Sequence, residues 1–329
     1  MNVPSLTEDF LLPSPIEELK LKQFPEYRIY IKRDDLIHSA ISGNKWRKLQ
    51  GVIRQYYKDN HESIVTFGGA FSNHLLATAV ICNKLKIPCY GYVRTDSIDR
   101  NNSTLSQCYN AGMTLIPMDR ISYQNKNRQD ILKGLQAHYK NCLIVPEGGS
   151  TSLVKEGMRN LLKEINAQAS EINEIICSLG TGGTACGILE CLQFEQKLLI
   201  SPAIKGLIQE DFLKIAKSLG IEIDHKNYEI SYHPSDKSYA KKDLELFSFC
   251  EDFLQEHAIL LDPIYTGKAM RNLLYRIEKK VVHKKRLCFI HSGGIQAWNG
   301  YFYRFPILEK KLPNIYRYMQ KYNEKLAEE

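Results

Sequence analysis

The chain has 329 residues, of which 43% are hydrophobic and 25% are charged, as is ordinary for a globular protein. This length is enough for one large α/β domain or for two domains. The net charge of +7 is scattered and forms no basic tract with interleaved aromatic residues, which argues against nucleic-acid binding. No apolar run reaches the length of a membrane span, and the N-terminus has no secretory signal, so we expect no membrane partner and a cytoplasmic location.

The nine cysteines include no Cys-x-x-Cys pair, and most lie in apolar patterns. This spacing predicts reduced, mostly buried thiols and no metal site.

Short β-rich segments alternate with helical patterns along nearly the whole chain. Strands are predicted at residues 28–32, 63–68, 89–93, 113–117, 142–146, 174–179, 203–208, 259–261 and 286–291. Helices are predicted at residues 45–58, 73–84, 129–139, 151–167 and 266–279, with a charged helical tail from Asn314 and an irregular loop at 232–243. This alternation indicates parallel sheets covered by helices, the doubly wound α/β class. We expect residues 50–147 to form a small α/β domain and residues 1–49 and 148–329 to form a larger one.

Lys45 is the most informative residue of the first predicted helix. It follows a Gly-Asn turn in Ser42-Gly43-Asn44-Lys45-Trp46-Arg47-Lys48-Leu49, and Lys48 lies one turn later. A lysine amine forms Schiff bases with carbonyl groups, and neighbouring cations lower its pKa so that free amine exists near neutrality. The alternative is that both lysines lie on a solvated helix face.

A glycine turn, Gly68-Gly69-Ala70-Phe71-Ser72-Asn73-His74, follows the strand predicted at 63–68 and begins the next helix. Ser72 and Asn73 could act as a helix cap alone, or they could form a carboxylate-binding turn with free backbone N–H groups. His74 is interpreted as a residue that orients the loop. No Gly-x-Ser-x-Gly elbow occurs, so a Ser-His nucleophile is not expected.

A second glycine turn, which we call the glycine cup, follows the strand predicted at 174–179. The cup comprises Gly180, Thr181, Gly182, Gly183 and Thr184. Glycines let successive backbone N–H groups point at one anion, and the threonines add hydroxyl donors, so the cup predicts a phosphate site. The alternatives are a tight turn without a ligand and a dinucleotide fingerprint. The fingerprint lacks the acidic residue expected about 20 positions later.

Further motifs occur in order with these three: Leu12-Pro13-Ser14-Pro15, Arg33-Asp34-Asp35, Val145-Pro146-Glu147-Gly148-Gly149-Ser150, Asp262-Pro263-Ile264-Tyr265-Thr266-Gly267-Lys268-Ala269 and His291-Ser292-Gly293-Gly294. Together they resemble the fold-type II pyridoxal-phosphate enzymes, in the family of 1-aminocyclopropane-1-carboxylate deaminase and D-cysteine desulfhydrase. The resemblance implies a tryptophan synthase β-like fold of two doubly wound α/β domains with open twisted sheets. It also implies that the larger domain binds pyridoxal 5'-phosphate and that the enzyme is a homodimer acting on a small amino acid.

By this resemblance, Lys45 would bond covalently to the cofactor and move protons at the substrate carbon. Lys48 and the glycine cup would hold the phosphate. Asn44 would steady the neighbouring loop, and Asn73 would hydrogen-bond the cofactor's ring oxygen.

The resemblance also implies the residues on the substrate side. Ser72 would face the substrate as an acid/base or carboxylate contact, beside Asn73 and His74. Tyr265 would lie beside the cofactor ring, as does the tyrosine of the family's Tyr-x-Gly-Lys motif. The family has a second active-site tyrosine upstream, for which Tyr239 has the expected spacing and Tyr232 is the substitute.

The residue that hydrogen-bonds the cofactor's pyridine nitrogen distinguishes the two activities. A carboxylate at this position makes the ring a stronger electron sink than a hydroxyl does. Deaminases of this family carry Glu directly after the motif tyrosine, whereas this chain has Thr266 there. The facing position is Ser292 in place of the deaminase's leucine. Both positions resemble the desulfhydrase, which predicts α,β-elimination of D-cysteine to pyruvate, ammonia and sulfide.

The alternative reaction is deamination of 1-aminocyclopropane-1-carboxylate to 2-oxobutanoate and ammonia. Phe71 stands where many members have Gln, and the loop after Ser150 is shorter than usual, so both could change the substrate. Competing interpretations are a serine/threonine dehydratase or racemase of the same fold, a nicotinamide-dependent oxidoreductase built on the glycine cup, and an inactive binding protein.

Overall fold

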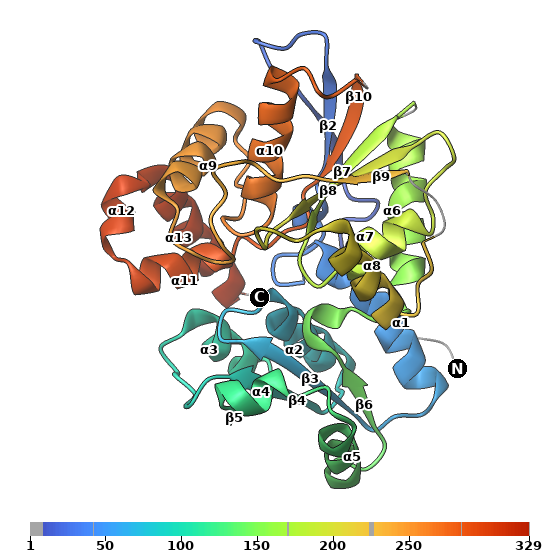
Figure 1. Ribbon diagram of the computed structural model, residues 1–329. Helices are drawn as coiled ribbons and strands as arrows, with labels where there is room; N and C mark the ends of the chain where they lie inside the picture. Colours follow the sequence, from blue (N-terminus) through green and yellow to red (C-terminus); the bar gives the residue numbers. More distant parts are fainter. Residues whose placement is uncertain (1–8, 42, 170, 224–226, 284, 329) are drawn as a thin grey trace.

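The computed structural model describes residues 9–41, 43–169, 171–223, 227–283 and 285–328. Ser42, which belongs to the lysine motif, lies outside these residues. Two β-sheets with helices packed around them form the molecule, one above the other in Figure 1. Within the described residues, no helix is both long enough and apolar enough to cross a membrane.

The larger sheet, sheet A, has six strands in the order β1-β2-β10-β7-β8-β9. Its strands are β1 Ile16–Leu19, β2 Arg28–Lys32, β7 Glu174–Leu179, β8 Lys197–Pro202, β9 Tyr228–Ile230 and β10 Arg286–Ile290. All neighbours are parallel except β1, which pairs antiparallel with β2 at the edge.

The smaller sheet, sheet B, has four parallel strands in the order β5-β4-β3-β6. Its strands are β3 Ser63–Gly69, β4 Cys89–Arg94, β5 Thr114–Met118 and β6 Cys142–Val145. Sheet B is therefore built only from residues 63–145, and sheet A only from residues before and after them. The predicted domain division follows the same pattern, but helix α1 continues past residue 50, and the boundaries stay a prediction.

The helices alternate with the strands, as the doubly wound pattern requires. They are α1 Asn44–Lys58, α2 Asn73–Leu85, α3 Ser103–Asn110, α4 Arg120–Gln124, α5 Gln129–His138, α6 Val154–Gln168, α7 Gly183–Leu189, α8 Gln209–Ser218, α9 Leu244–His257, α10 Thr266–Glu278, α11 Ala297–Arg304, α12 Ile307–Lys311 and α13 Pro313–Glu328. Short 3-10 turns occur at Asp34–Leu36 and Glu147–Gly149.

Both faces of each sheet are buried, which explains the continuous apolar strands. In β10, Leu287 and Phe289 pack in a core with α9, α10, α11 and α13, whereas Cys288 and Ile290 pack on the opposite face with α6, α7 and α8. These two sets of helices lie on either side of sheet A in Figure 1. Sheet B likewise packs on α1, α2 and α3 with one face and on α4 and α5 with the other.

Two of the predicted strands are wrong. Residues 203–208 form a turn, because the strand of this region is β8, which ends at Pro202, and Gly206 adopts a φ of +84°. Residues 259–261 are buried but pair with no strand in the described part of the chain. Their backbone carbonyl groups accept hydrogen bonds from side chains instead. Leu260 O accepts from His291 Nε2 at 2.8 Å, and Leu261 O accepts from Trp298 Nε1 at 2.9 Å.

Other predicted elements are confirmed. The loop at 232–243 is irregular, and the C-terminal tail is the helix α13. Strands β1 and β9 were not predicted, because each is a short edge strand of four or three residues without a continuous apolar run. All nine cysteines are unpaired, and eight of them are buried.

Candidate active site

Most of the predicted site residues lie where a strand ends or a helix begins. Ser72 and Asn73 follow β3 of sheet B, the glycine cup follows β7, and Ser292 follows β10 of sheet A. Tyr265 directly precedes α10, and Lys45 lies in the first turn of α1. Ligands of open α/β sheets bind beyond the carboxyl ends of the parallel strands, so this arrangement is that of a binding site.

The start of α1 is set by Gly43, whose backbone approaches sheet A closely. Gly43 has a φ of +67°, and an added Cβ would lie 1.9 Å from the carbonyl oxygen of Ser292. Only glycine is compatible with both the conformation and the contact. The N–H of Asn44 donates to the same carbonyl at 3.2 Å, which fixes the first turn of α1 next to β10.

Lys45 is partly buried, and its Nζ donates to Asn44 Oδ1 at 2.7 Å. Burial lowers its pKa to about 8, although the negative charge of Asp262 acts in the opposite direction. At this pKa about a tenth of the amine is neutral at pH 7, which is what attack on an aldehyde needs.

Lys48 is a buried amine whose hydrogen-bond partners are neutral oxygens. Its Nζ donates to Gly148 O at 3.1 Å, to Ser150 Oγ at 3.0 Å and, at the limit of hydrogen bonding, to Thr181 Oγ1 at 3.5 Å. Burial, with the charge of Lys45, lowers the pKa of Lys48 well below its usual value. An anion placed here would reverse this effect, because an opposite charge favours the ammonium form.

The glycine cup lies against these lysines. Thr181 Oγ1 is 2.6 Å from Ser150 Oγ, and Thr184 Oγ1 accepts from Asn44 Nδ2 at 3.0 Å. Gly182 directly precedes α7 as its N-cap with a φ of +89°, and an added Cβ would lie 2.2 Å from Ile215. The cup therefore depends on glycine for its shape, and it adjoins both Asn44 and Lys48.

The glycine turn after β3 presents the N-terminus of α2. Ser72 caps this helix by accepting from Leu75 N at 3.3 Å, so its predicted capping role is present. Asn73 Oδ1 is buried and has no hydrogen-bond partner within the described residues. The amides of the first helical turn have no intrahelical acceptor, so Asn73 and His74 can offer backbone donors there.

His74 is a neutral, buried imidazole. Its Nε2 lies 2.7 Å from Thr66 Oγ1, which donates its own proton to Val145 O at 2.9 Å. Nε2 must therefore donate, which leaves Nδ1 as an unprotonated acceptor, buried and without a partner among the described residues. Burial, with the charges of Lys45 and Lys48, lowers the pKa of His74 to about 3.

Two tyrosines meet on the opposite side of the site. The Tyr239 and Tyr265 hydroxyls are 2.9 Å apart, and burial raises the pKa of both phenols. Gly180 packs against Tyr265, since an added Cβ would lie 2.9 Å from its ring. Tyr232 has no such contact with Tyr265 among the described residues, so of the two candidates only Tyr239 reaches the motif tyrosine.

Asp262 organises the start of α10 and is a residue that the sequence analysis did not assign. Its carboxylate accepts from the N–H groups of Tyr265 at 2.8 Å and Thr266 at 2.7 Å, and from Thr266 Oγ1 at 2.6 Å. Ser150 was also missed. An Asp shortly before a helix and a Ser after a glycine pair are the signals that could have indicated them.

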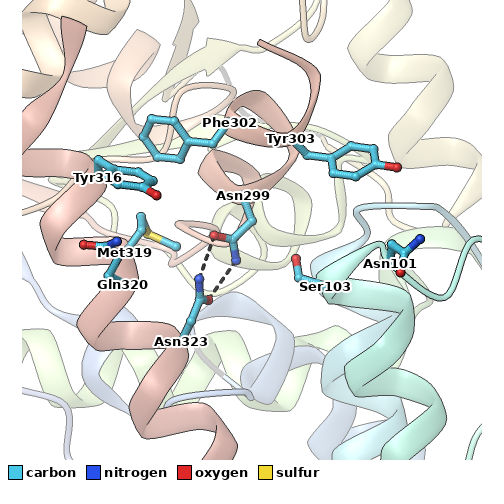
Figure 2. A pocket seen from close by; sticks show the side chains of 9 residues that line it. All are labelled: Asn101, Ser103, Asn299, Phe302, Tyr303, Tyr316, Met319, Gln320 and Asn323. Atoms are coloured by element: carbon cyan, nitrogen blue, oxygen red, sulfur yellow. Dashed lines mark hydrogen bonds between the residues drawn. The ribbon is translucent and has the colours of Figure 1, made fainter. Parts of the chain in front are cut away.

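A hollow of about 200 Å³ lies elsewhere, between α3, α11 and α13 (Figure 2). In it, the side-chain amides of Asn299 and Asn323 donate to each other at 2.9 and 3.0 Å. None of its lining side chains is charged, and none is a predicted site residue. This hollow is therefore separate from the candidate active site.

Comparison with known proteins agrees with this geometry. The family model described as "Pyridoxal-phosphate dependent enzyme" matches residues 8–293. A D-cysteine desulfhydrase of Yersinia pestis is 28% identical over 309 residues, which are 88% of this chain and 93% of that protein. A putative 1-aminocyclopropane-1-carboxylate deaminase of Thermotoga maritima is 26% identical over 299 residues, which are 87% of this chain and 95% of that protein.

The fold is also found among solved structures. A structure described as an ACC deaminase homologue superposes with a TM-score of 0.76 at 23% identity, covering 94% of this chain and 95% of that one. The predicted fold class and cofactor are thus confirmed. Since the family model covers most of the sequence, the chain belongs to the pyridoxal-phosphate dependent enzymes.

Proposed function

We propose that this enzyme catalyses α,β-elimination of a small amino acid, with D-cysteine first, to give pyruvate, ammonia and sulfide. Similarity to D-cysteine desulfhydrases over most of the chain supports this reaction. The observation that carries the choice is Thr266, which stands where the family's deaminases have Glu. A threonine side chain has no carboxylate, and its hydroxyl donates a hydrogen bond to Asp262 Oδ2 at 2.6 Å.

The residues of the site fit pyridoxal phosphate. The amine of Lys45 suits the cofactor's aldehyde, and the buried Lys48 with its neutral partners suits the phosphate. The unpartnered Asn73 amide oxygen marks a polar position that a ligand would complete. When bound, the cofactor supplies an electron sink that stabilises a carbanion at the substrate's Cα.

Two hydroxyls, on Thr266 and Ser292, are candidates for the cofactor's pyridine nitrogen. Thr266 Oγ1 donates its only proton to Asp262 and also accepts from the Asp262 N–H at 2.8 Å. The Ser292 hydroxyl has no such bond within the described residues, and only its carbonyl is engaged, by Asn44 N–H. We therefore propose that the Ser292 hydroxyl hydrogen-bonds the pyridine nitrogen. Thr266 would instead anchor Asp262 at the start of α10.

Lys45 and the tyrosine pair would divide the proton transfers. A neutral Lys45 amine can take the Cα proton of the substrate, and its lowered pKa makes that form accessible near neutrality. The Cβ–S bond then breaks, and sulfur leaves with the bonding pair. Tyr265 or Tyr239, both kept protonated by burial, would donate a proton to the departing sulfur. The released enamine tautomerises, and water hydrolyses it to pyruvate and ammonia.

The substrate carboxylate would bind at the start of α2. The backbone N–H groups of Asn73 and His74 lie in the first turn, where no intrahelical acceptor is available, and a helix N-terminus favours an anion. The Ser72 side chain, which already caps the helix, would border the same position.

An amino-acid panel tests the reaction directly. The purified enzyme should release sulfide and pyruvate from D-cysteine in equal amounts. If it instead produced 2-oxobutanoate from 1-aminocyclopropane-1-carboxylate and nothing from D-cysteine, the deaminase alternative would hold. Turnover of serine or threonine alone would indicate a dehydratase, and cofactor binding without turnover of any amino acid would indicate a binding protein. A nicotinamide oxidoreductase does not fit the family of this chain.

We also propose that the enzyme is a cytoplasmic homodimer. The unpaired and mostly buried cysteines support a reducing compartment. The dimer rests on the family resemblance, and light scattering of the purified protein would measure it.

A further inference from the structure

Lys268 is a buried amine close to the tyrosine pair, and the proposed reaction does not use it. It lies in the first turn of α10, three residues after Tyr265, and only 4% of it is exposed. Its Nζ donates to Ala203 O at 2.9 Å and to Lys237 O at 2.8 Å. Both partners are backbone carbonyls, and they belong to two separate loops, one after β8 and one after β9. Lys268 therefore joins these loops to the helix that begins at the motif tyrosine.

Lys237 belongs to the irregular loop 232–243, which also carries Tyr239 two positions later. Tyr239 is 43% exposed, although its hydroxyl meets that of Tyr265, and it belongs to no hydrophobic core cluster of the described residues. The next residue, Ala240, has a φ of +53°, which is unfavourable for a residue other than glycine and persists where the surrounding structure holds it. The position of the Tyr239 hydroxyl therefore depends on how the loop backbone is held and not on packing in a core.

Arg271, one turn after Lys268, holds the two ends of the segment that carries this tyrosine. It pairs with Asp236 before the tyrosine and, at 3.3 Å, with Asp243 after it, and both aspartates are buried. Lys268 contacts the segment between these ends, on the residue that follows Asp236. Helix α10 therefore fixes the loop backbone on both sides of the tyrosine, and two side chains of one helix face do so.

The other partner of Lys268 connects the tyrosine-bearing loop to the phosphate side of the site. Ala203 follows the last residue of β8, and its N–H donates to Leu179 O at 2.9 Å. Leu179 ends β7 and directly precedes Gly180 of the glycine cup. A lysine ammonium has three donors, so one such group can hold several carbonyls at once. Lys268 therefore fixes the loop relative to the strand end that carries the cup.

We propose that Lys268 is a positioning residue that places the Tyr239 hydroxyl against Tyr265 for proton transfer to the leaving group. This inference rests on the proposed function, in which the tyrosine pair protonates the departing sulfur. When the Cβ–S bond breaks, the bonding pair leaves with sulfur as hydrosulfide. The hydrosulfide takes a phenolic proton to become hydrogen sulfide, and water restores the phenol. A leaving group that is a stable anion, such as chloride, takes no proton and does not need this arrangement.

Lys268→Met tests this role with two substrates that differ in their leaving group. The variant removes the ammonium and keeps most of the side chain, and the holoenzyme is assayed with D-cysteine and with β-chloro-D-alanine. We expect kcat/KM for D-cysteine to fall about 10- to 100-fold, as displacement of a general acid would give. The value for β-chloro-D-alanine should stay within about 2-fold. A structural defect would lower both alike, so equal losses, or no loss for D-cysteine, overturn the inference.

A double-mutant cycle with Tyr239→Phe tests whether Lys268 acts through this tyrosine. Tyr239→Phe alone should show the same selective loss with D-cysteine. Adding Lys268→Met should then lower the rate by less than about 2-fold more, because both changes remove the same function. No loss in Tyr239→Phe, or losses that multiply, would show that Lys268 does not act through Tyr239 and would overturn the inference.

Lys205→Met is the matched control. Lys205 is exposed, and its Nζ donates to Pro234 O of the same loop at 3.4 Å. The control removes the same charge and one contact with the loop, and both substrates should keep their rates within about 2-fold. If Lys268→Met does not fold, Lys268→Gln, which keeps an amide donor, is measured against the same criteria.

The outcome is separable from that of the proposed reaction. If the natural protein releases sulfide from D-cysteine but Lys268→Met shows no selective loss, the reaction stands and the inference fails. If it releases none, the reaction proposal fails, and hydrogen exchange of the holoenzyme decides whether Lys268 holds the loop. The Lys241 amide, which donates to Ser238 O at 3.2 Å, should then exchange about 10-fold faster in Lys268→Met. Unchanged exchange would overturn the inference.

Discussion

Arg47 lies two residues after Lys45 in α1, and replacing it by Met tests whether a buried ion network holds this helix in place. Its guanidinium donates to Asp34 at 2.8 and 3.2 Å and to Glu164 at 2.6 and 2.8 Å. The side chains of Arg47 and Asp34 are each 1% exposed. The network joins α1 to the segment after β2 and to α6, and so it positions the end of α1 that carries Lys45.

The expected loss of stability follows from what Arg47→Met leaves behind. Glu164 keeps an ion pair with Lys32 at 2.8 Å, but Asp34 keeps only the Ser14 hydroxyl, at 2.6 Å, as a direct side-chain partner among the described residues. Removing one partner of a buried pair typically costs about 3–5 kcal/mol, because the remaining charge is uncompensated. We expect a loss of this size in the free energy of unfolding.

Urea denaturation at pH 7 and a fixed cofactor concentration measures this change. Arg54→Met is the matched control, since Arg54 lies on the same helix and pairs with Glu156 in an exposed contact, where less than about 1 kcal/mol is expected. Adding Asp34→Asn to Arg47→Met should recover part of the loss. A loss below about 1 kcal/mol for Arg47→Met, or one equal to that of Arg54→Met, would refute the reasoning.

Three further predictions concern the site itself. Lys48→Met should weaken cofactor binding about 10- to 100-fold, since a charged hydrogen bond to phosphate is lost, and equilibrium dialysis that shows unchanged affinity would contradict this. Gly43→Ala should lower the melting temperature and abolish activity, because its Cβ would lie 1.9 Å from Ser292 O; a fully active variant would show that α1 can shift. The rate at which the apoenzyme condenses with pyridoxal phosphate should rise with pH and level off above about 8, because only neutral Lys45 attacks and burial lowers its pKa to about 8. Stopped-flow absorbance with a midpoint near 10.5, the unperturbed value, would argue against this assignment.

Short stretches of sequence were sufficient to predict many of the strands and turns that carry the site. The buried strands β3 and β7 and the glycine turns after them were predicted because apolar runs and glycines are read within a few residues. Lys45 was found in the same way, from a Gly-Asn turn before a helical pattern. Conversely, residues 259–261 were apolar enough for a strand, but their carbonyls bond distant side chains.

The assembly of the site depends on contacts between residues far apart in the chain. Lys48 meets Ser150 across 102 positions, and Asn44 meets Thr184 across 140. Spacing alone left two candidates for the second tyrosine, and the hydrogen bond to Tyr265 distinguishes Tyr239. Such pairs are set by how two sheets pack, which no local window of sequence contains.

The amino-acid sequence by itself thus determined which chemical groups are available: an amine after a glycine turn, a glycine cup and a motif tyrosine. Only the tertiary structure decided their chemical state. His74 is neutral and donates through Nε2 because Thr66 has already given its proton to Val145 O. The Thr266 hydroxyl donates its only proton to Asp262 and so has none left to donate elsewhere. Burial and hydrogen-bond partners set protonation, and both exist only once the chain has folded.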